Sequence, residues 1–266
     1  MHGEVRSTQR LTPQLMRVVL GGDGLAGFVA PKSADAYVNC AFLPDGAAYE
    51  VPFDPEAVRG LPAEERPYPR RLTVRAWDEA TRELTLDIAV HGDAGYAGRW
   101  AMHAKPGDKL QFKGPADGYV PHPDADSYLF VGDESALPAI AVAAEMVSPG
   151  KPVTIVAEVE DADGEIALDS PGDLEVHWVH RAGQSDLDDL MANVVAGLPK
   201  PQGRLSAFVH GEAAETRAVR RVLLGEKRVD LDWLSCSPYW RRGLNDEEWR
   251  SIKGQWVRDV NAESFD

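Results

Sequence analysis

The chain has 266 residues, 44% of them hydrophobic, so it is long enough for two packed domains and too apolar to be disordered. Lys and Arg number 28 against 43 Asp and Glu, and the net charge of −15 argues against general binding of nucleic acid or anionic membranes. The longest apolar run, 136–147, is too short to span a bilayer, so no integral membrane association is expected. The N-terminus is polar, and Cys40 and Cys236 lie far apart. We therefore expect a cytoplasmic protein with two free thiols and no cysteine metal cluster.

Residues 1–123 contain short apolar runs that proline and glycine interrupt. Strands are predicted at 16–20, 36–42, 72–77, 83–90 and 109–113. Within 83–90, apolar residues alternate with polar ones, as in a half-buried strand. The helix expected here covers 94–105. Short strands with one helix predict a small antiparallel β-barrel.

Residues 124–243 alternate between strands and helices. Strands are predicted at 128–131, 153–159, 174–180, 205–209 and 230–234, and helices at 136–147, 186–198 and 213–224. This alternation predicts an open α/β sheet with crossover helices. The remaining segment, 244–266, is expected to form a C-terminal helix over 245–260. Asn245 is a suitable N-cap, and Trp249, Ile252, Trp256 and Val260 form a stripe suited to packing.

Gly22, Gly24 and Gly27 match the G-x-G-x-x-G pattern of dinucleotide-binding folds, and a predicted strand precedes them. No helix is predicted after them, because Pro31 follows closely. The pattern binds a pyrophosphate only where a helix begins. We therefore interpret these glycines as a turn between barrel strands.

Two segments of the first domain suit a phosphate-bearing ligand. Arg70 and Thr73 lie at the start of a strand, where a guanidinium beside a hydroxyl can bind phosphate; a solvated basic strand explains the spacing equally well. In the second segment, 91–101, a glycine-rich turn opens a short helix, so backbone N–H groups can approach an anion. His91 by itself is more typical of a structural role.

A third segment, 132–139, joins the first strand of the α/β domain to its first helix. Open α/β sheets bind dinucleotides at this kind of junction. Ser135 can cap the helix and Pro138 fits its first turn, so helix capping alone would also explain these residues.

Together these three segments resemble the siderophore-interacting protein family, which comprises ferric-siderophore reductases of the ferredoxin–NADP reductase-like superfamily. The resemblance covers nearly the whole chain. The family pattern Arg-x-Tyr-Thr-x-Arg is matched at Arg70, Thr73 and Arg75. The pattern His-Gly-Asp-x-Gly-Pro-Ala-x-x-Trp-Ala is matched at His91, Gly92, Asp93, Gly95, Ala97, Trp100 and Ala101. Gly-Asp-Glu-Thr-Ala-Leu-Pro-Ala is matched over 132–139 with Ser135 for Thr, and a Gly-Glu pair before a helix is matched at Gly211 and Glu212.

The resemblance implies FAD in domain 1–123 and NADH or NADPH in domain 124–243, with hydride passing to the flavin and single electrons passing on to Fe(III). It implies no acid or base catalyst. The residues implied to hold FAD are Arg70, Leu72, Thr73, Val74, His91, Gly92, Gly95, Ala97 and Trp100. Those implied to meet the nicotinamide nucleotide are Gly132, Asp133, Glu134, Ser135, Ala136, Gly211 and Glu212. Trp240 is expected to cover the flavin face or, equally, to be a core residue.

Three positions depart from the family pattern. Leu72 replaces a tyrosine that stacks on the flavin, so flavin affinity or potential is expected to differ. Tyr96 replaces a proline and is a candidate for the missing aromatic surface. Pro238 replaces a glycine before Tyr239.

The choice of nicotinamide donor rests on the ends of two predicted strands. Glu158, Glu160 and Asp161 favour the free ribose hydroxyl of NADH, whereas His180 and Arg181 could meet the 2′-phosphate of NADPH. We lean towards NADH.

The implied substrate is a ferric siderophore, and many such chelates are anionic, so a local basic rim is needed. Its candidates are Arg241, Arg242, Arg250 and Lys253, which an ordinary charged helix face would also explain. Two alternatives stay open: a flavin reductase that serves a ferredoxin, and a siderophore- or flavin-binding protein without turnover.

Overall fold

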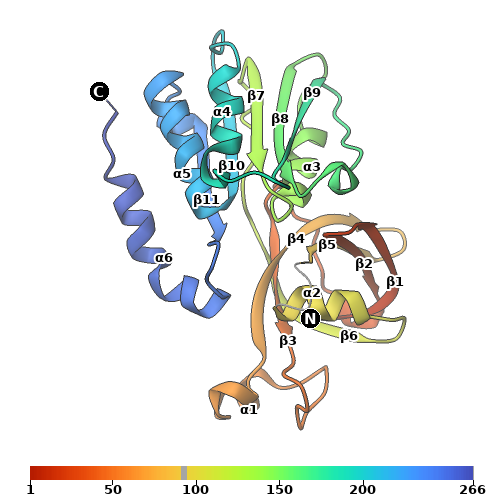
Figure 1. Ribbon diagram of the computed structural model, residues 1–266. Helices are drawn as coiled ribbons and strands as arrows, with labels where there is room; N and C mark the ends of the chain where they lie inside the picture. Colours follow the sequence, from red (N-terminus) through yellow and green to blue (C-terminus); the bar gives the residue numbers. More distant parts are fainter. Residues whose placement is uncertain (91–94, 266) are drawn as a thin grey trace. The chain divides into compact units, whose positions relative to one another are not determined.

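The computed structural model describes residues 1–90 and 95–265 (Figure 1). The chain divides into two compact units, one covering 1–118 and the other beginning at Tyr119. No helix in the described ranges has the length and apolar character needed to cross a membrane.

The first unit is a closed antiparallel barrel with the strand order β1-β2-β5-β4-β3-β6. Its strands are β1 (His2–Thr12), β2 (Leu15–Gly21), β3 (Tyr37–Phe42), β4 (Tyr68–Asp78), β5 (Glu83–Ala89) and β6 (Lys109–Ala116). Alternate residues of β2 and β5 are fully buried, as Val18, Leu20, Leu84 and Leu86 show. Period-two alternation thus fills the barrel interior and confirms the predicted architecture.

The described residues of the barrel unit include two α-helices, α1 (Pro55–Arg59) and α2 (Tyr96–His103). The prediction missed α1 and also β1, a polar strand with few apolar residues that pairs with both β2 and β6. The three glycines of the rejected motif lie around a short 3₁₀ turn, Asp23–Leu25, and no α-helix follows. A Cβ at Gly24 would lie 2.3 Å from the carbonyl oxygen of His2, so close packing explains that glycine.

The second unit contains a five-stranded parallel sheet in the order β11-β10-β7-β8-β9. The strands are β7 (Ser127–Gly132), β8 (Pro152–Val159), β9 (Asp173–His180), β10 (Leu205–Glu212) and β11 (Leu234–Trp240). The helices are α3 (Leu137–Glu145), α4 (Leu190–Gly197), α5 (Ala213–Arg221) and α6 (Asp246–Asn261). The central strands β7 and β10 are buried almost throughout, as parallel strands covered by helices require.

The last strand lies later than predicted. Asp230 accepts a hydrogen bond from the N–H of Asp232 and so begins a 3₁₀ turn, Leu231–Trp233. The strand starts only at Leu234, and the prediction of 230–234 was wrong because the aspartate caps a turn.

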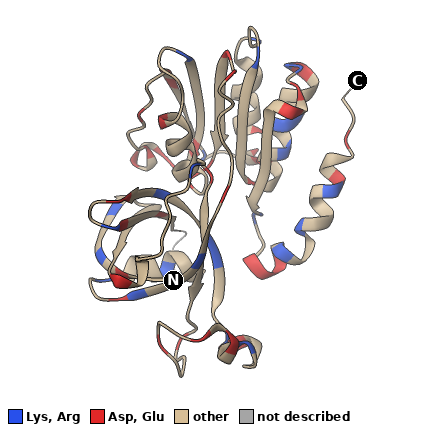
Figure 2. Ribbon diagram, turned by 180° about the vertical axis from the view of Figure 1, so that it is seen from behind, with Lys and Arg blue, Asp and Glu red and all other residues tan. Residues whose placement is uncertain are grey.

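Helix α6 begins with a capping box in which Asn245 and Glu248 exchange side-chain-to-backbone hydrogen bonds. Trp249 is 1% exposed and its Nε1 donates to the carbonyl of Tyr239, which attaches α6 to the end of β11. Of the predicted stripe, Ile252 stays 46% exposed. Figure 2 shows acidic residues at the first turn of α6, where their negative charge interacts favourably with the helix dipole.

Candidate functional sites in the two units

The strand order of the second unit indicates where a ligand would be expected to bind. From β7 the chain proceeds to β8 on one side, and after β9 it returns to β10 on the other side of β7. The carboxyl ends of β7 and β10 therefore form the switch point at which open α/β sheets bind ligands. Gly132 ends β7, and Gly211 and Glu212 end β10, so the topology brings these predicted residues together.

Asp133 is the centre of this switch point and is 2% exposed. Its Oδ1 accepts the N–H of Ser135 at 2.8 Å and the Ser135 hydroxyl at 2.5 Å. Its Oδ2 accepts the N–H of Glu212 at 2.8 Å and Nε1 of Trp240 at 2.7 Å. One carboxylate thus ties the turn after β7 to the ends of β10 and β11.

The two glycines are required by this close approach. A Cβ at Gly132 would lie 2.4 Å from the carbonyl oxygen of His210, and one at Gly211 would lie 2.8 Å from Oδ2 of Asp133. Gly211 also has a φ of +137°, a conformation that other residues rarely adopt. The turn after β7 already uses its own N–H groups, since Ala136 and Leu137 donate to the Asp133 carbonyl.

Glu212 caps α5 and connects it to the segment after β11. Its Oε2 accepts the N–H groups of Ala214 and Glu215, and its Oε1 accepts the N–H of Arg242 at 3.0 Å. Arg242 also pairs with Glu215 and with Asp188. The predicted Gly-Glu pair therefore begins the helix and at the same time fixes the course of the chain beyond Trp240.

Arg181 binds the carboxyl ends of β7 and β8 together. Its guanidinium makes two hydrogen bonds to Glu134, at 2.6 and 2.8 Å. It also lies 2.9 Å from Glu160 and 3.7 Å from Glu158. His180 is paired with Glu165 at 2.8 Å. The sequence patterns did not indicate that Arg181 and Glu134 would pair, because they are 47 residues apart.

Burial raises the pKa of several carboxyls in this region. Desolvation is the main cause for Asp133, Glu158 and Glu215, and neighbouring carboxylates raise the pKa values of Glu158 and Glu215 further. One carboxyl oxygen of Glu158 and one of Glu215 are buried without a hydrogen-bond partner in the described part of the chain. Protonation of these two side chains would remove part of the repulsion.

The four predicted substrate-binding cations all lie after β11, and each already has a partner. Arg241 lies 3.6 Å from Glu212, and Arg250 pairs with Asp246 at 2.8 Å. Lys253 donates to the carbonyl of Pro238 at 2.6 Å, while Arg242 is held as described above. The side chains of Arg241 and Arg250 remain 35% and 42% exposed.

In the first unit, Arg70 and Tyr96 meet on one side of the barrel. The guanidinium of Arg70 lies 5.5 Å from the centre of the Tyr96 ring, which stacks on Tyr68 with centroids 3.5 Å apart. Arg99 lies 5.8 Å from the same ring. Tyr68 was missed, although its spacing of two residues from Arg70 along β4 indicates that both face the same side.

A hollow of about 300 Å³ lies next to these residues, between α2 and the end of β3. It is lined by Phe42, Leu43, Asp45, Tyr96, Arg99, Trp100 and His103. Trp100 packs edge-on against Phe42, and Arg99 pairs with Asp45 at 3.1 Å. Aromatic faces beside a cation suit a planar group that carries phosphate.

The other predicted flavin residues occupy different places. Leu72 and Ala97 are half-buried against the barrel core, and Thr73 is 9% exposed. The N–H of Val74 donates to the carbonyl of Ala36, so this backbone donor is already used within the barrel unit. Gly95 precedes α2 with a φ of +77° and open space where a Cβ would lie. His91 and Gly92 lie outside the described residues.

Comparison with known proteins matches both units. Residues 4–119 match the model of the siderophore-interacting FAD-binding domain, and residues 125–243 match that of the siderophore-interacting protein. The chain is 32% identical to the ferric vibriobactin reductase ViuB of Vibrio cholerae over 89% of this chain and 88% of that protein. An antiparallel barrel followed by a parallel α/β sheet, with these matches, defines the class of proteins that combine an FAD-binding domain with an α/β domain. Within this class, the chain belongs to the siderophore-interacting protein family.

Two further similarities agree with this assignment. An NADPH-dependent ferric-chelate reductase of Escherichia coli is 35% identical over 54% of this chain and 56% of that protein. The structure of the siderophore-interacting protein SipS from Aeromonas hydrophila matches with a TM-score of 0.82 and 28% identity, over 97% of this chain and 98% of that chain.

Proposed function

We propose that the protein is an FAD-containing ferric-siderophore reductase that uses a reduced nicotinamide donor. The observation that carries the proposal is the hollow beside α2 in the barrel unit, where aromatic rings and Arg99 line a space of about 300 Å³ and Arg70 lies near the Tyr96 ring. Membership of a family with named ferric-chelate reductases supports the reaction class.

The described residues fit FAD. The hollow between Trp100 and Tyr96 suits the adenine, and the open space at Gly95 lets a pyrophosphate approach the backbone before α2. Arg70 and Arg99 both lie near the Tyr96 ring and would neutralise phosphate charge. His91 and Gly92 remain proposed from the family pattern alone.

The nicotinamide nucleotide would lie against the switch point of the second unit. Gly132 and Gly211 let the ends of β7 and β10 pack closely there, and Asp133, Glu134, Ser135, Ala136 and Glu212 would shape the edges of the site. When bound, FAD supplies the chemistry that links a two-electron hydride donor to a one-electron acceptor such as Fe(III). The protein's own part is to position these groups, to shield them from water and to set the local charge.

We further propose NADH as the preferred donor. Three nitrogens of Arg181 already face Glu134 and Glu160, and His180 is paired with Glu165. A 2′-phosphate at this edge would meet more carboxylates than cations. Glu158, which the sequence suggested as a ribose contact, is 1% exposed, so exposed Glu160 is the better candidate for that role.

For the ferric chelate, Arg241 and Arg250 are the proposed contacts, because both keep exposed guanidinium surface. Arg242 and Lys253 would act mainly by holding the chain after β11 in place, since Arg242 binds two carboxylates and Lys253 donates to a backbone carbonyl.

An anaerobic titration tests the proposal. The FAD-loaded protein is mixed with NADH or NADPH while the flavin absorbance is followed, and a ferric siderophore is added afterwards. We expect bleaching that is faster with NADH, followed by return of the yellow colour and release of Fe(II). A protein that takes up no FAD would contradict the function. Bleaching that only a ferredoxin reverses would favour a reductase with a protein partner. The absence of bleaching would favour a binding protein without turnover, an alternative suggested by Leu72 in place of the stacking tyrosine.

A further inference from the structure

A buried guanidinium lies outside the sites described so far. Arg220, on α5, is 4% exposed, and its Nη1 is sealed from solvent without a hydrogen-bond partner. Within residues 1–90 and 95–265 no carboxylate pairs with Arg220, whose guanidinium lies over the Phe265 ring, 5.3 Å from its centre. The exposed arginines beside it, Arg217 and Arg221, both pair with Glu263. A buried cation without an anion is unfavourable, so this site is incomplete.

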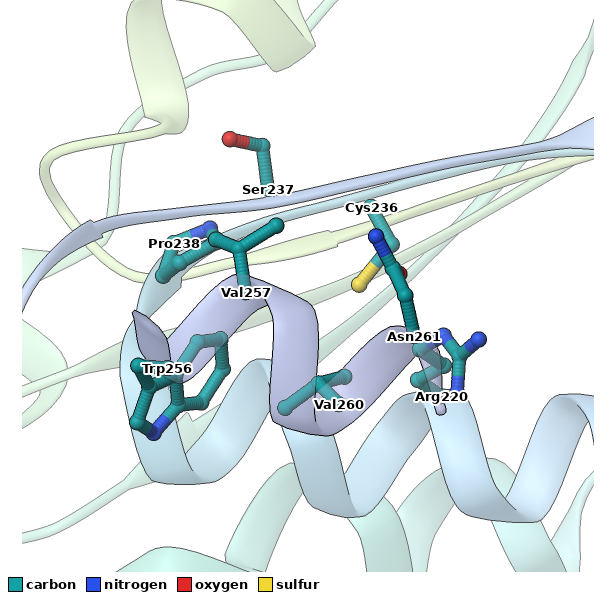
Figure 3. A pocket seen from close by; sticks show the side chains of 8 residues that line it. All are labelled: Arg220, Cys236, Ser237, Pro238, Trp256, Val257, Val260 and Asn261. Carbon is teal, nitrogen blue, oxygen red and sulfur yellow. The ribbon is translucent and has the colours of Figure 1, made fainter. Parts of the chain in front are cut away.

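Arg220 faces a small cavity of about 50 Å³ between α5, β11 and α6 (Figure 3). Figure 3 shows Cys236 and Pro238 pointing from β11 towards α6, while Ser237 points to the opposite side of the strand. The amide of Asn261 extends from α6 towards Cys236. The cavity therefore has a polar end, formed by Arg220, Asn261 and Cys236.

Apart from Ser237, whose side chain points away, the remaining lining is apolar and consists of Pro238, Trp256, Val257 and Val260. We propose that this cavity is a binding site for a small monocarboxylate anion, held by Arg220 and Asn261. The guanidinium fork matches a carboxylate, and one negative charge balances one positive charge. The apolar walls match a short hydrocarbon group, whereas a fully solvated oxyanion such as phosphate would lose hydration there without enough donors in return.

Electrostatics within the cavity agree with this geometry. Burial raises the pKa of Cys236 to about 12, and the charge of Arg220 acts in the opposite direction. The thiol is therefore neutral at physiological pH and does not compete as an anion for Arg220. An occupant would connect α5, β11 and α6, so binding should stabilise the docking of α6.

Thermal unfolding of the full-length protein tests the site. Sodium acetate is titrated against sodium chloride and sodium phosphate at constant ionic strength. We expect acetate to raise the Tm saturably, by roughly 2 to 5 °C at ten times its Kd, and the other two salts to have no comparable effect. Arg220→Met should abolish the response, whereas Arg221→Met, which removes the exposed neighbour, should retain it. Equal effects of all three salts, or an acetate response that survives in Arg220→Met, would overturn the proposal.

A second measurement uses the native protein and does not depend on the folding of a variant. Iodoacetate and iodoacetamide both alkylate a thiolate with loss of iodide, and only the former carries a carboxylate. We expect the rate ratio of iodoacetate to iodoacetamide at Cys236, read by peptide mass spectrometry, to be several-fold higher in the folded protein than in the urea-unfolded chain. Acetate should suppress this excess. A ratio that folding leaves unchanged, or a lack of iodoacetate labelling where iodoacetamide labels Cys236, would contradict an anion site.

Discussion

At the scale of single residues, Asp133 shows how one side chain can hold together the ends of three strands at the switch point. Its two oxygens accept four hydrogen bonds from Ser135, Glu212 and Trp240, although burial raises its pKa. The hydrogen bonds compensate for the loss of hydration and keep the turn after β7 against β10. Asp133 is thus primarily an organising residue of the switch point.

We expect Asp133→Asn to destabilise the protein by about 1 to 3 kcal/mol. An amide has only one acceptor oxygen. Its NH₂ group would therefore face donor groups, either those of Ser135 or those of Glu212 and Trp240, and lose these hydrogen bonds. Urea unfolding measures the change, and Asp124→Asn, at an exposed position, is the control. An unchanged free energy of unfolding would contradict the organising role.

Tyr96 is the second residue with a distinct expectation. It stacks on Tyr68, lies near the guanidiniums of Arg70 and Arg99, and lines the hollow proposed for FAD. We expect Tyr96→Leu to weaken FAD binding by about 1 kcal/mol, roughly fivefold in Kd, because stacking and cation–π contacts are lost. Fluorescence titration of the apoprotein with FAD measures the change. Tyr49→Leu, elsewhere in the barrel unit, should leave the Kd unaltered.

At the scale of elements, α6 depends on its first turn. The capping box of Asn245 and Glu248 satisfies backbone donors that the helix itself leaves unpaired. We expect Asn245→Ala to cost about 1 kcal/mol and to increase hydrogen exchange over 246–253 in particular. Equal protection of α6 in the variant and the wild type would show that Trp249 packing alone holds the helix.

The carboxyls between β8 and α5 predict a pH dependence. Because the pKa of Glu215 is raised, the folded protein keeps a proton that the unfolded chain releases above pH 4.5. The contribution of Glu215 to the free energy of unfolding therefore decreases as the pH rises above 4.5, by up to about 1.4 kcal/mol per pH unit. His210, whose pKa burial lowers, has the opposite effect below pH 6.5.

Comparison with Glu215→Gln isolates this effect, because the contribution of His210 is common to both proteins. We expect the stability of wild type relative to the variant to decrease between about pH 5 and pH 7. Urea unfolding at several pH values provides the measurement. A relative stability that stays constant or increases would mean that Glu215 is ionised in the folded protein.

At the scale of the whole molecule, the net charge of −15 acts on every anionic ligand that approaches. The cations proposed for the chelate are also paired with acids, which weakens their attraction at a distance. We expect kcat/KM for an anionic ferric chelate to rise several-fold from about 0.01 to 0.2 M salt, as screening reduces the repulsion. A neutral chelate is the control. A decrease with salt would show that a basic rim dominates.

The sequence by itself determined the two kinds of unit and indicated the segments that we propose to bind ligands. Alternating and continuous apolar runs depend on local periodicity, which a chain displays without its fold, and the motifs at 70–75 and 132–139 are contiguous. The sequence did not reveal β1, because that strand contains few apolar residues. It also did not reveal the turn at 231–233, after which β11 begins.

Only the tertiary structure decided which distant side chains meet. The pairing of Glu134 with Arg181, the stack of Tyr68 on Tyr96 and the cavity that Arg220 faces all join residues far apart in the chain. Such contacts depend on strand order, register and helix docking, which no local pattern encodes. For the same reason Glu158 suggested a ribose contact by its position in the sequence, while the fold buries it against Arg181.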